Sequence, residues 1–299
     1  MRKIIGLFLA IFVLSLAAVY VFIPSQISIK GSQIVYQPST SVIRGMMQTA
    51  KWSEWMPKDI TLKATSSLVA TIQADLNQDG IQVPVVFTIE NGENKNSIIG
   101  YETSMDNRQW SPIARVQYFI FAKKIQNNLN KVLIAAGNYY NDTKGIYGFE
   151  IVETKVKDTS LIAINQTLKD TPNLVQIYQM IDQLKSYINT QNGKTKGDPM
   201  VNITKLDKNE IYVQVAIPLE RDIPAKDAFT IKKMVLGNLL AVKVQGSQAK
   251  VNAAFEATML YINDKQKSSP AIPFVIYNTN RLLEKDSSRW ISTINYPIY

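Results

Sequence analysis

Cysteine and histidine are both absent from the 299 residues of this chain. Without cysteine there are no disulfides, no thiolate nucleophiles and no sulfur ligands for a metal ion. Without histidine the chain lacks the commonest general base and the commonest metal ligand. Ser-His-Asp and Cys-His catalytic groups and histidine-rich zinc sites are therefore excluded, and we expect neither a bound metal nor a cofactor. Any chemistry would have to use Glu, Asp, Lys, Tyr or water.

Acidic residues are fewer than basic residues: the chain contains 24 Asp and Glu against 33 Lys and Arg, which gives a net charge of +9. A basic surface could meet nucleic acid or anionic lipid headgroups. The positive charges are scattered along the chain rather than gathered in a run, which favours solvated lysines. We therefore expect no nucleic-acid partner. Glycine-rich phosphate loops, Ser-x-x-Lys and paired-carboxylate motifs are missing as well.

The N-terminal segment is the one long uncharged stretch. Residues 4–23 contain no charged side chain and follow Arg2 and Lys3. A helix of about 20 residues spans about 30 Å, the thickness of a bilayer's hydrocarbon core. A cleaved signal peptide is the alternative, but the run stays apolar to its end without a small-residue cleavage motif. We expect residues 1–25 to anchor the chain in the inner (cytoplasmic) membrane as a single pass, with the remainder on the extracytoplasmic side.

The stretch 26–137 alternates between strand and helix signals in an order typical of one compact domain. Its apolar residues alternate, or recur at helical spacing, in segments bounded by turn residues. The expected elements are a strand at 27–37, a short helix near 39–47, strands near 61–70, 83–89, 97–103 and 115–119, and a helix from about 120 to 133. This order predicts an α+β domain in which an antiparallel sheet grips its closing helix.

Two tryptophan-containing motifs in this stretch carry a family resemblance. Residues 52–57 read Trp-Ser-Glu-Trp-Met-Pro, and residues 110–115 read Trp-Ser-Pro-Ile-Ala-Arg. With these motifs, residues 26–137 resemble the SRPBCC superfamily of START-like and polyketide cyclase-related proteins. The resemblance implies a helix-grip fold that encloses an apolar cavity for a lipid or another small hydrophobic molecule. Trp52 and Trp55 are candidates for the floor of that cavity, with ordinary packing in the core as the alternative.

Residues 138–149 are rich in Asn, Asp, Gly and Tyr and predict a linker to a second domain, 150–299. That domain contains a weak internal repeat, 151–219 and 229–299. Tyr-Ile-Asn at 187–189 recurs 74 residues later (261 − 187), and the start of a strand at 199 recurs at the same offset, at 273. Such a repeat suggests two β-α-β-β units packed with pseudo-twofold symmetry. The seam between two like units is a natural place for a ligand cleft.

Turn and cap signals place the elements of the second domain. A helix is expected to start at Thr171-Pro172, with Thr as its N-cap and Pro at its first helical position. The other expected elements are strands at 150–166, 200–203, 210–218 and 229–245, a helix at 248–265, and two closing strands that end near residue 299. The chain as a whole is therefore predicted to be α+β, with a transmembrane helix, a helix-grip domain and a duplicated β-α-β-β domain.

The second domain resembles the GyrI-like, or AraC-type effector-binding, domain. The motifs that carry the resemblance are residues 245–247 before a helix, the strand 273–277, the closing signature 284–294, and the Tyr-Pro pair at 296–297. The resemblance implies two like halves that hold an aromatic or apolar small molecule between them. In members that bind cations or hydrolyse strained rings, a glutamate stands two residues before the strand tyrosine. Here Val275 takes that position before Tyr277, which argues against a cationic ligand and against hydrolysis.

Candidates for ligand binding are the aromatic residues near the predicted seam, together with the valine in place of the family's acid. They are Tyr212, Phe255, Phe274, Val275, Tyr277, Trp290 and Tyr296. For each aromatic residue, an ordinary place in the core is the alternative.

Three functions compete on these grounds. The first is a membrane-anchored, non-catalytic protein that binds an apolar or aromatic small molecule, with its oligomeric state left open. The second is a hydrolase or cyclase that uses Tyr and Glu in the cleft of the second domain, which would require a buried carboxylate of raised pKa. The third is the sensor domain of a transcriptional regulator, although no helix-turn-helix pattern precedes the domain.

Overall fold

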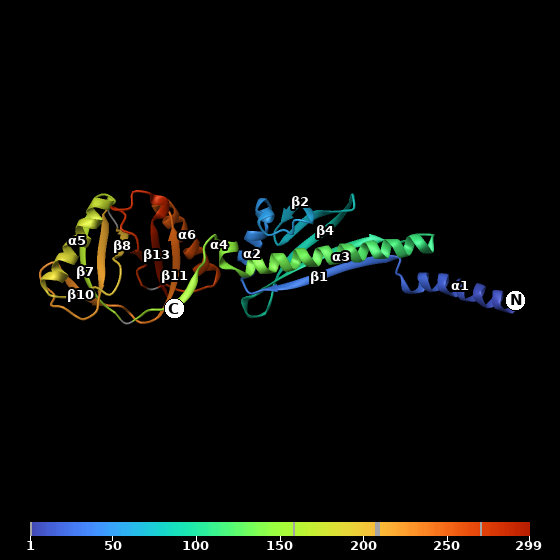
Figure 1. The fold of residues 1–299 in the computed structure, drawn as a ribbon, viewed down its shortest axis with the longest axis horizontal. Coiled ribbons are helices and arrows are strands. Elements are labelled where there is room, and N and C mark those ends of the chain that lie inside the picture. Colours follow the sequence, from blue (N-terminus) through green and yellow to red (C-terminus); the bar gives the residue numbers. More distant parts are fainter. Residues whose placement is uncertain (1, 158, 207–209, 270) are drawn as a thin grey trace. The chain divides into compact units, whose positions relative to one another are not determined.

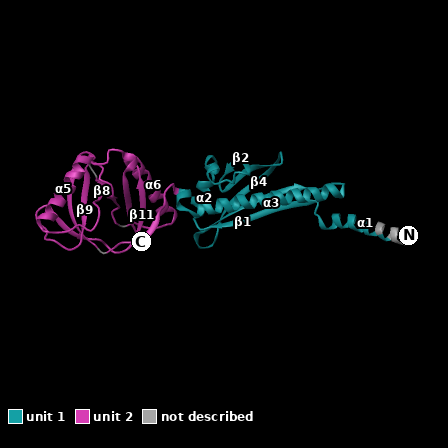
Figure 2. Ribbon diagram, viewed as in Figure 1, with its two compact units in different colours: residues 1–146 teal, residues 147–299 magenta. Residues whose placement is uncertain are grey.

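The computed structural model of the chain describes residues 2–157, 159–206, 210–269 and 271–299, without the side chains of residues 2–6, 8 and 9 (Figure 1). The chain forms two compact units, residues 1–146 and 147–299 (Figure 2). The boundary between them falls inside the predicted linker, 138–149. That linker is largely helical rather than irregular, because α3 runs to Asn141 and a short helix, α4 (Thr143–Tyr147), follows.

The first unit is built on an antiparallel sheet with the strand order β1-β5-β4-β3-β2. Its strands are β1 (Gln26–Val35), β2 (Thr61–Leu68), β3 (Thr71–Gln78), β4 (Ile81–Asn91) and β5 (Ser97–Asp106). Between β1 and β2 lie α2 (Ser39–Met46) and the 3-10 turn η1 (Thr49–Glu54), and the turn η2 (Glu93–Lys95) joins β4 to β5. The long helix α3 (Pro112–Asn141) packs along β1 and β5 (Figure 1). The predicted α+β class, with a sheet and a closing helix, is confirmed.

The predicted strand at 115–119 is wrong, because these residues form the first turns of α3. The Ser111 side chain caps the helix by accepting a hydrogen bond from the Ala114 N–H at 3.4 Å. Pro112 occupies the first turn, where the missing N–H has no helical partner to lose. The β-branched and aromatic residues at 115–119 favour a strand locally, but this start signal and the helix that follows outweigh them.

Aromatic and aliphatic side chains fill the core of the first unit. Trp52 is buried, its indole N–H donates to the Met46 carbonyl at 2.8 Å, and its ring lies 5.8 Å from that of Trp55. Trp55 in turn packs edge-to-face on Tyr140 at 5.9 Å. A cavity of about 210 Å³ in this unit, between β1 and α3, touches neither tryptophan. Trp52 thus packs in the core and Trp55 against it, and their role as a cavity floor stays a prediction.

The partly buried side chain of Tyr139, beside Glu54, makes the stability of the first unit depend on pH in the alkaline range. The Tyr139 hydroxyl donates to Glu54 Oε2 at 2.6 Å. Burial, helped by this hydrogen bond and the carboxylate charge, raises the pKa of Tyr139 to about 12. Between about pH 10, the ordinary tyrosine value, and about 12, the folded chain keeps a proton that the unfolded chain releases. The contribution of protonated Tyr139 to the stability of the folded state is therefore complete below about pH 10. It is lost as the pH rises toward about 12.

We expect the Tyr139→Phe variant to lose less stability than the wild type across this window, since it has no proton to release. Urea unfolding of both proteins at a series of values from about pH 8 to about pH 12, followed by circular dichroism, measures the difference. Parallel curves for the two proteins would show that Tyr139 does not carry the effect.

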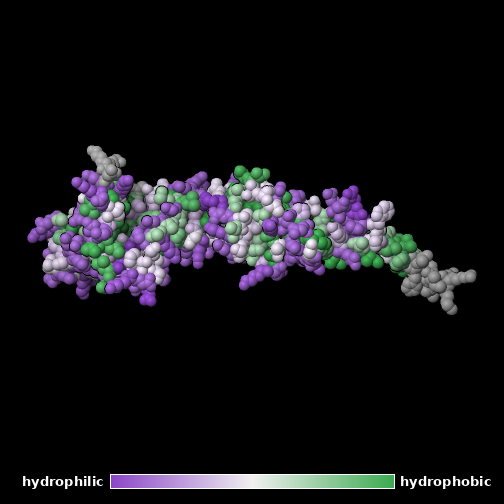
Figure 3. Space-filling model, turned by 90° about the horizontal axis from the view of Figure 1, so that it is seen from above, coloured by the Kyte–Doolittle hydropathy of each residue, from purple (hydrophilic) through white to green (hydrophobic). Residues whose placement is uncertain are grey.

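Helix α1 (Arg2–Phe22) joins the first unit at its C-terminal end. The Tyr20 hydroxyl donates to the Trp110 carbonyl, the Arg115 guanidinium lies 4.9 Å from the Tyr20 ring centroid, and Arg115 also donates to the Ile23 carbonyl at 2.6 Å. Most of its described side chains are exposed, and hydrophobic residues colour its surface in Figure 3. Within the described part of the chain, no helix is long and apolar enough to cross a membrane. The predicted span, 4–23, includes side chains that lie outside the described residues.

The second unit is an antiparallel sheet with the strand order β10-β7-β9-β8-β12-β13-β11-β6. The first repeat supplies β7 (Ser160–Leu168), α5 (Leu174–Thr190), β8 (Met200–Lys205) and β9 (Ile211–Leu219). The second supplies β11 (Asn238–Gln245), α6 (Gln248–Asp264), β12 (Phe274–Tyr277), the turn η4 (Ser287–Arg289) and β13 (Ile291–Ile298). Two further strands, β6 (Val152–Lys155) and β10 (Thr230–Lys233), pair with β11 and β7 of the opposite repeat. This β-α-β-β duplication agrees with the repeat in the sequence.

The two repeats meet at β8 and β12, which form the centre of the sheet. Val201 pairs with Val275 there. These two valines are 74 residues apart (275 − 201), the offset of the sequence repeat, so equivalent residues of the two repeats are direct neighbours. The pseudo-twofold axis therefore passes beside this pair. Helix α5 packs mainly on β7 and β9, and α6 mainly on β11 and β13, so the central strands lie between the two helices.

Several predicted boundaries in the second unit are wrong. The single strand predicted at 150–166 is two strands, β6 and β7, and the one predicted at 229–245 is β10 and β11. Each first strand can then leave its own repeat and pair with the other. Helix α5 starts at Leu174 with Asn173, rather than Thr171, as its N-cap. Asn173 accepts from the Gln176 N–H, and the Gln176 side chain accepts from the Asn173 N–H, both at 2.9 Å, which is a capping box.

Candidate functional site

A cavity of about 830 Å³ lies between α5 and α6, over the central strands β8 and β12 of the second unit. The two helices cover the outer strands of each half, so the middle of the sheet is left open between them. The first repeat contributes Leu174, Ile177 and Val201 to the walls, and the second contributes Phe255, Tyr277 and Trp290. The cavity thus lies at the seam between the two repeats, and we call it the seam cavity.

Most of the predicted ligand-binding residues come together on this cavity. Its lining includes Phe255, Val275, Tyr277, Trp290 and Tyr296. The rings of Phe255 and Tyr296 lie edge-to-face at 6.5 Å. Their role in binding stays a prediction, but the structure places them where such a role requires.

The other two predicted residues, Phe274 and Tyr212, lie elsewhere because side chains alternate between the faces of a strand. Val275 and Tyr277 are buried on the face of β12 that lines the seam cavity, whereas Phe274 lines a smaller cavity of about 350 Å³. Tyr212 lines neither cavity, and its hydroxyl donates to Gln214 Oε1 at 3.2 Å.

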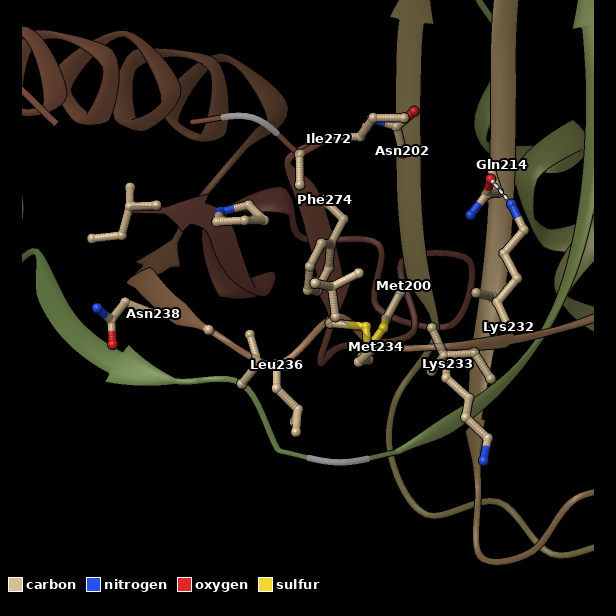
Figure 4. A pocket seen from close by; sticks show the side chains of 18 of the residues that line it. Met200, Asn202, Gln214, Lys232, Lys233, Met234, Leu236, Asn238, Ile272 and Phe274 are labelled. Carbon is tan, nitrogen blue, oxygen red and sulfur yellow. Dashed lines mark hydrogen bonds between the residues drawn. The ribbon is translucent and has the colours of Figure 1, made fainter. Parts of the chain in front are cut away.

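The smaller cavity lies beneath the segment that joins β10 to β11 (Figure 4). Phe274, Met200 and Met234 point toward one another there, and Lys232 Nζ donates to Gln214 Oε1 at 2.8 Å (Figure 4). The two methionines pack against the small apolar cluster of Leu161, Ala163 and Ala216. The charged side chains of its described lining, Lys232 and Lys233, are exposed. The seam cavity is the better candidate site because it is larger and holds a buried charge.

That buried charge is Arg281, which sequence reasoning missed. Arg281 lies in the loop between β12 and β13 and is 3% exposed. Its guanidinium carbon lies 3.8 Å from the ring centroid of Tyr277 and 5.1 Å from that of Trp290. No periodicity or motif marks this position. The only signal in the sequence is its place shortly before the closing signature, 284–294.

Hydrogen bonds at both ends fix the backbone around Arg281. The Thr279 N–H donates to the Ile291 carbonyl at 3.1 Å, and the Thr279 hydroxyl oxygen accepts from the Ile291 N–H at 3.0 Å, which closes the base of the loop. The Arg281 N–H donates to the Tyr178 hydroxyl oxygen, on α5 of the other repeat, at 2.7 Å. Arg281 is thus positioned by both halves of the unit.

Three titratable groups at the cavity, Tyr277, Tyr178 and Arg281, are held in their protonated states. Burial raises the pKa of Tyr277 and of Tyr178, and the charge of Arg281 opposes that effect only in part. Burial lowers the pKa of Arg281, but the ordinary value of an arginine is so high that the side chain stays charged. No Asp or Glu is among the described residues that line the cavity. The site therefore offers apolar surface, hydrogen-bond donors and one buried positive charge, without a carboxylate base.

Metal binding finds no support in the part of the chain that the structure describes. No group of three or more acidic side chains there is arranged to hold an ion. Apart from Lys205 and Arg281, the polar side chains that line the cavity are mainly amides and hydroxyls, such as those of Asn202, Thr204 and Asn252.

Comparison with known proteins adds solved structures of similar arrangement. No profile of a protein family matches the chain. No curated protein sequence matches it significantly. The C-terminal domain of EcmrR is 11% identical, with a TM-score of 0.41, and covers 50% of this chain and 98% of its own. A putative transcription regulation protein from Staphylococcus aureus MU50 is 15% identical, with a TM-score of 0.34, over 50% of this chain and 99% of its own.

A third structure, SAV2435 bound to tetraphenylphosphonium, is 15% identical, with a TM-score of 0.36, over 50% of this chain and 94% of its own. All three structures are less than 25% identical to this chain. At TM-scores of 0.34 to 0.41 they do not establish a family for this chain.

Proposed function

We propose that this chain is a small-molecule-binding protein whose aromatic or apolar ligand is held in the seam cavity. The observation that carries the proposal is the cavity itself, which both repeats enclose and whose volume is about 830 Å³. Ligand pockets are typically clefts of about 300–1,000 Å³ with apolar and aromatic walls and a few placed polar groups. Phe255, Trp290 and Tyr296 supply such walls, and Asn202 and Gln248 supply polar groups. The sequence resemblance to effector-binding domains supports the same function.

Replacing Phe255 with alanine is expected to weaken binding of a naphthalene-based ligand about tenfold, because an aromatic contact and its buried area are lost. Isothermal titration of the full chain, after a thermal-shift screen of naphthalene derivatives, measures this change. The matched control is Phe274→Ala, which removes the same side chain from the smaller cavity on the other face of the sheet. A loss of affinity in the Phe274 variant alone would place the ligand in that cavity instead and would overturn the assignment.

A hydrolase or cyclase in the same cavity is less favoured. Such an enzyme would need a carboxylate beside the reacting atoms, and the described lining contains none. Burial also raises the pKa of Tyr277, so its phenol is a poor base near neutral pH.

Two further proposals rest on the sequence. Residues 26–137 would be a START-like domain, supported by the order of sheet and closing helix in the first unit. Residues 4–23 would attach the chain to the inner membrane, supported by the uncharged run that follows Arg2 and Lys3. Recovery of the full chain in the soluble fraction after membranes are sedimented would count against that attachment.

A further inference from the structure

Arg281 carries a positive charge inside the seam cavity, and no carboxylate of the described residues pairs with it. Its Nη1 donates to Gln248 Oε1 at 2.8 Å, and its Nη2 donates to Ser292 Oγ at 2.7 Å. Both acceptors are neutral. Its Nε is buried and has no hydrogen-bond partner among the described residues. The guanidinium thus keeps an unsatisfied N–H and an uncompensated charge.

A buried positive charge is more stable when a negatively charged group pairs with it. Burying an ionised group is costly unless it is paired and hydrogen-bonded. The ring of Tyr277, 3.8 Å from the guanidinium carbon, and that of Trp290, at 5.1 Å, attract the cation and hold its plane. They do not neutralise it. The two hydrogen bonds to neutral acceptors do not neutralise the charge either. The stacking and the hydrogen bonds therefore orient the guanidinium without supplying a negative charge.

The surroundings of Arg281 are positive as well. Helix α6 begins at Gln248, which accepts the hydrogen bond from Arg281, and its N-cap Ser247 makes no side-chain cap bond. The first N–H groups of a helix carry partial positive charge. Lys205 adds a second cation at the exposed rim of the cavity. With no acid among the described lining residues, the cavity attracts negative charge.

We propose that the ligand of the seam cavity is an anion, a flat aromatic or apolar molecule that carries a carboxylate bound by Arg281. This inference rests on the proposed function and assigns the charge of the ligand. A carboxylate can accept two parallel hydrogen bonds from a guanidinium, and the free Nε–H supplies one of them. The apolar part of the ligand then lies against Trp290 and Phe255. Val275 fits this site, since an acid at that position would compete for the same guanidinium.

The charge preference can be measured on the unmodified full chain with three probes of the same shape. We expect isothermal titration to show that naphthoate binds about ten to a hundred times more tightly than naphthamide, because only naphthoate makes a charge-assisted hydrogen bond. Naphthylmethylammonium should bind most weakly. If the amide equals the carboxylate, or the ammonium binds best, the seam cavity keeps its function and the charge assignment fails. If none of the three binds, the proposed function fails together with this inference.

A pair of matched variants links the preference to Arg281. Arg281→Met should bring the affinities for naphthoate and naphthamide close to each other. Arg289→Met, which removes the same charge from an exposed side chain in η4 outside the cavity, should leave the wild-type ratio unchanged. If circular dichroism shows that Arg281→Met does not fold, Arg281→Lys is the second variant. It keeps the positive charge but loses the two parallel N–H donors of the guanidinium, and it should lower the ratio of the affinities for naphthoate and naphthamide severalfold. A folded Arg281 variant with the wild-type ratio would overturn the proposal.

Discussion

Replacing Phe87 with alanine is expected to lower the free energy of unfolding of the first unit by about 3–5 kcal/mol, the usual cost of truncating a buried phenylalanine. Phe87, on β4, is 2% exposed. Its ring lies 6.1 Å from that of Trp52 and 6.4 Å from that of Tyr101. The Tyr101 hydroxyl donates to Asn130 Oδ1 on α3 at 2.6 Å. Phe87 therefore fills the space that η1, the sheet and the long helix share, and its loss leaves a cavity that none of them can close alone.

Urea unfolding of the full chain gives the size of this effect, and hydrogen exchange read by mass spectrometry shows where it falls. Amides of β3 and β4 should exchange faster in the variant, while those of β8 and β12 should keep the wild-type rate. Trp110→Ala is the control, because that side chain is 95% exposed and its removal should change stability by less than about 0.5 kcal/mol. A loss below about 1 kcal/mol for Phe87→Ala would show that the core is not packed as described.

The second large effect is expected at Val275, where a glutamate should form an ion pair with Arg281. Val275 lies two residues from Tyr277 on the same face of β12, so their Cβ atoms are about 7 Å apart. Because the Arg281 guanidinium lies on the Tyr277 ring, we expect a glutamate side chain at position 275 to reach it. In the Val275→Glu variant the new pair should remove the binding of naphthoate. Combined with Arg281→Met, the same glutamate is buried alone, which should cost about 3–5 kcal/mol of stability.

A double-mutant cycle of Val275→Glu and Arg281→Met, measured by chemical unfolding, isolates the energy of the pair. Ile276→Glu is the matched control, since residue 276 points to the other face of β12 and its glutamate has no path to the guanidinium. The control cycle should show no coupling beyond about 0.5 kcal/mol. If the Val275 cycle is equally uncoupled, Arg281 does not face the position that we assign to it.

The sequence predicted the location of the seam cavity better than it predicted the members of its lining. The 74-residue offset identified Val201 and Val275 as equivalent, and the structure pairs them at the centre of the sheet. A repeat of this kind can be detected from the sequence because it depends on the order of helices and strands, and local sequence patterns indicate that order. Phe274 and Val275 are both candidates from the sequence, but alternation along the strand puts them on opposite faces, so strand parity applied to 273–277 separates the two.

Arg281 was beyond the reach of sequence patterns for a physical reason. Its burial depends on partners that are far away along the chain, such as Tyr178 at a separation of 103 residues. A loop arginine is usually solvated, so nothing local distinguishes this one. The long helix gives the reverse case. Ser111 and Pro112 form a local start signal for this helix, a cap followed by a proline. The strand-like residues at 115–119 outweigh that signal in the sequence and lead to the prediction of a strand.

The exchange of β6 and β10 between the repeats has a consequence for biosynthesis. Residues 160–219 supply β7, β8 and β9 to the growing chain. The outer edge of β7 stays unpaired until β10 emerges, and β8 lacks its neighbour β12 until residues 274–277 follow. The second half closes only when β13 enters between β12 and β11. At 5–20 residues per second, the ribosome needs roughly 4–14 s to go from the end of β8, at residue 205, to the end of β12, at residue 277. For that interval β8 exposes an unpaired edge, which is open to pairing with another chain until β12 covers it.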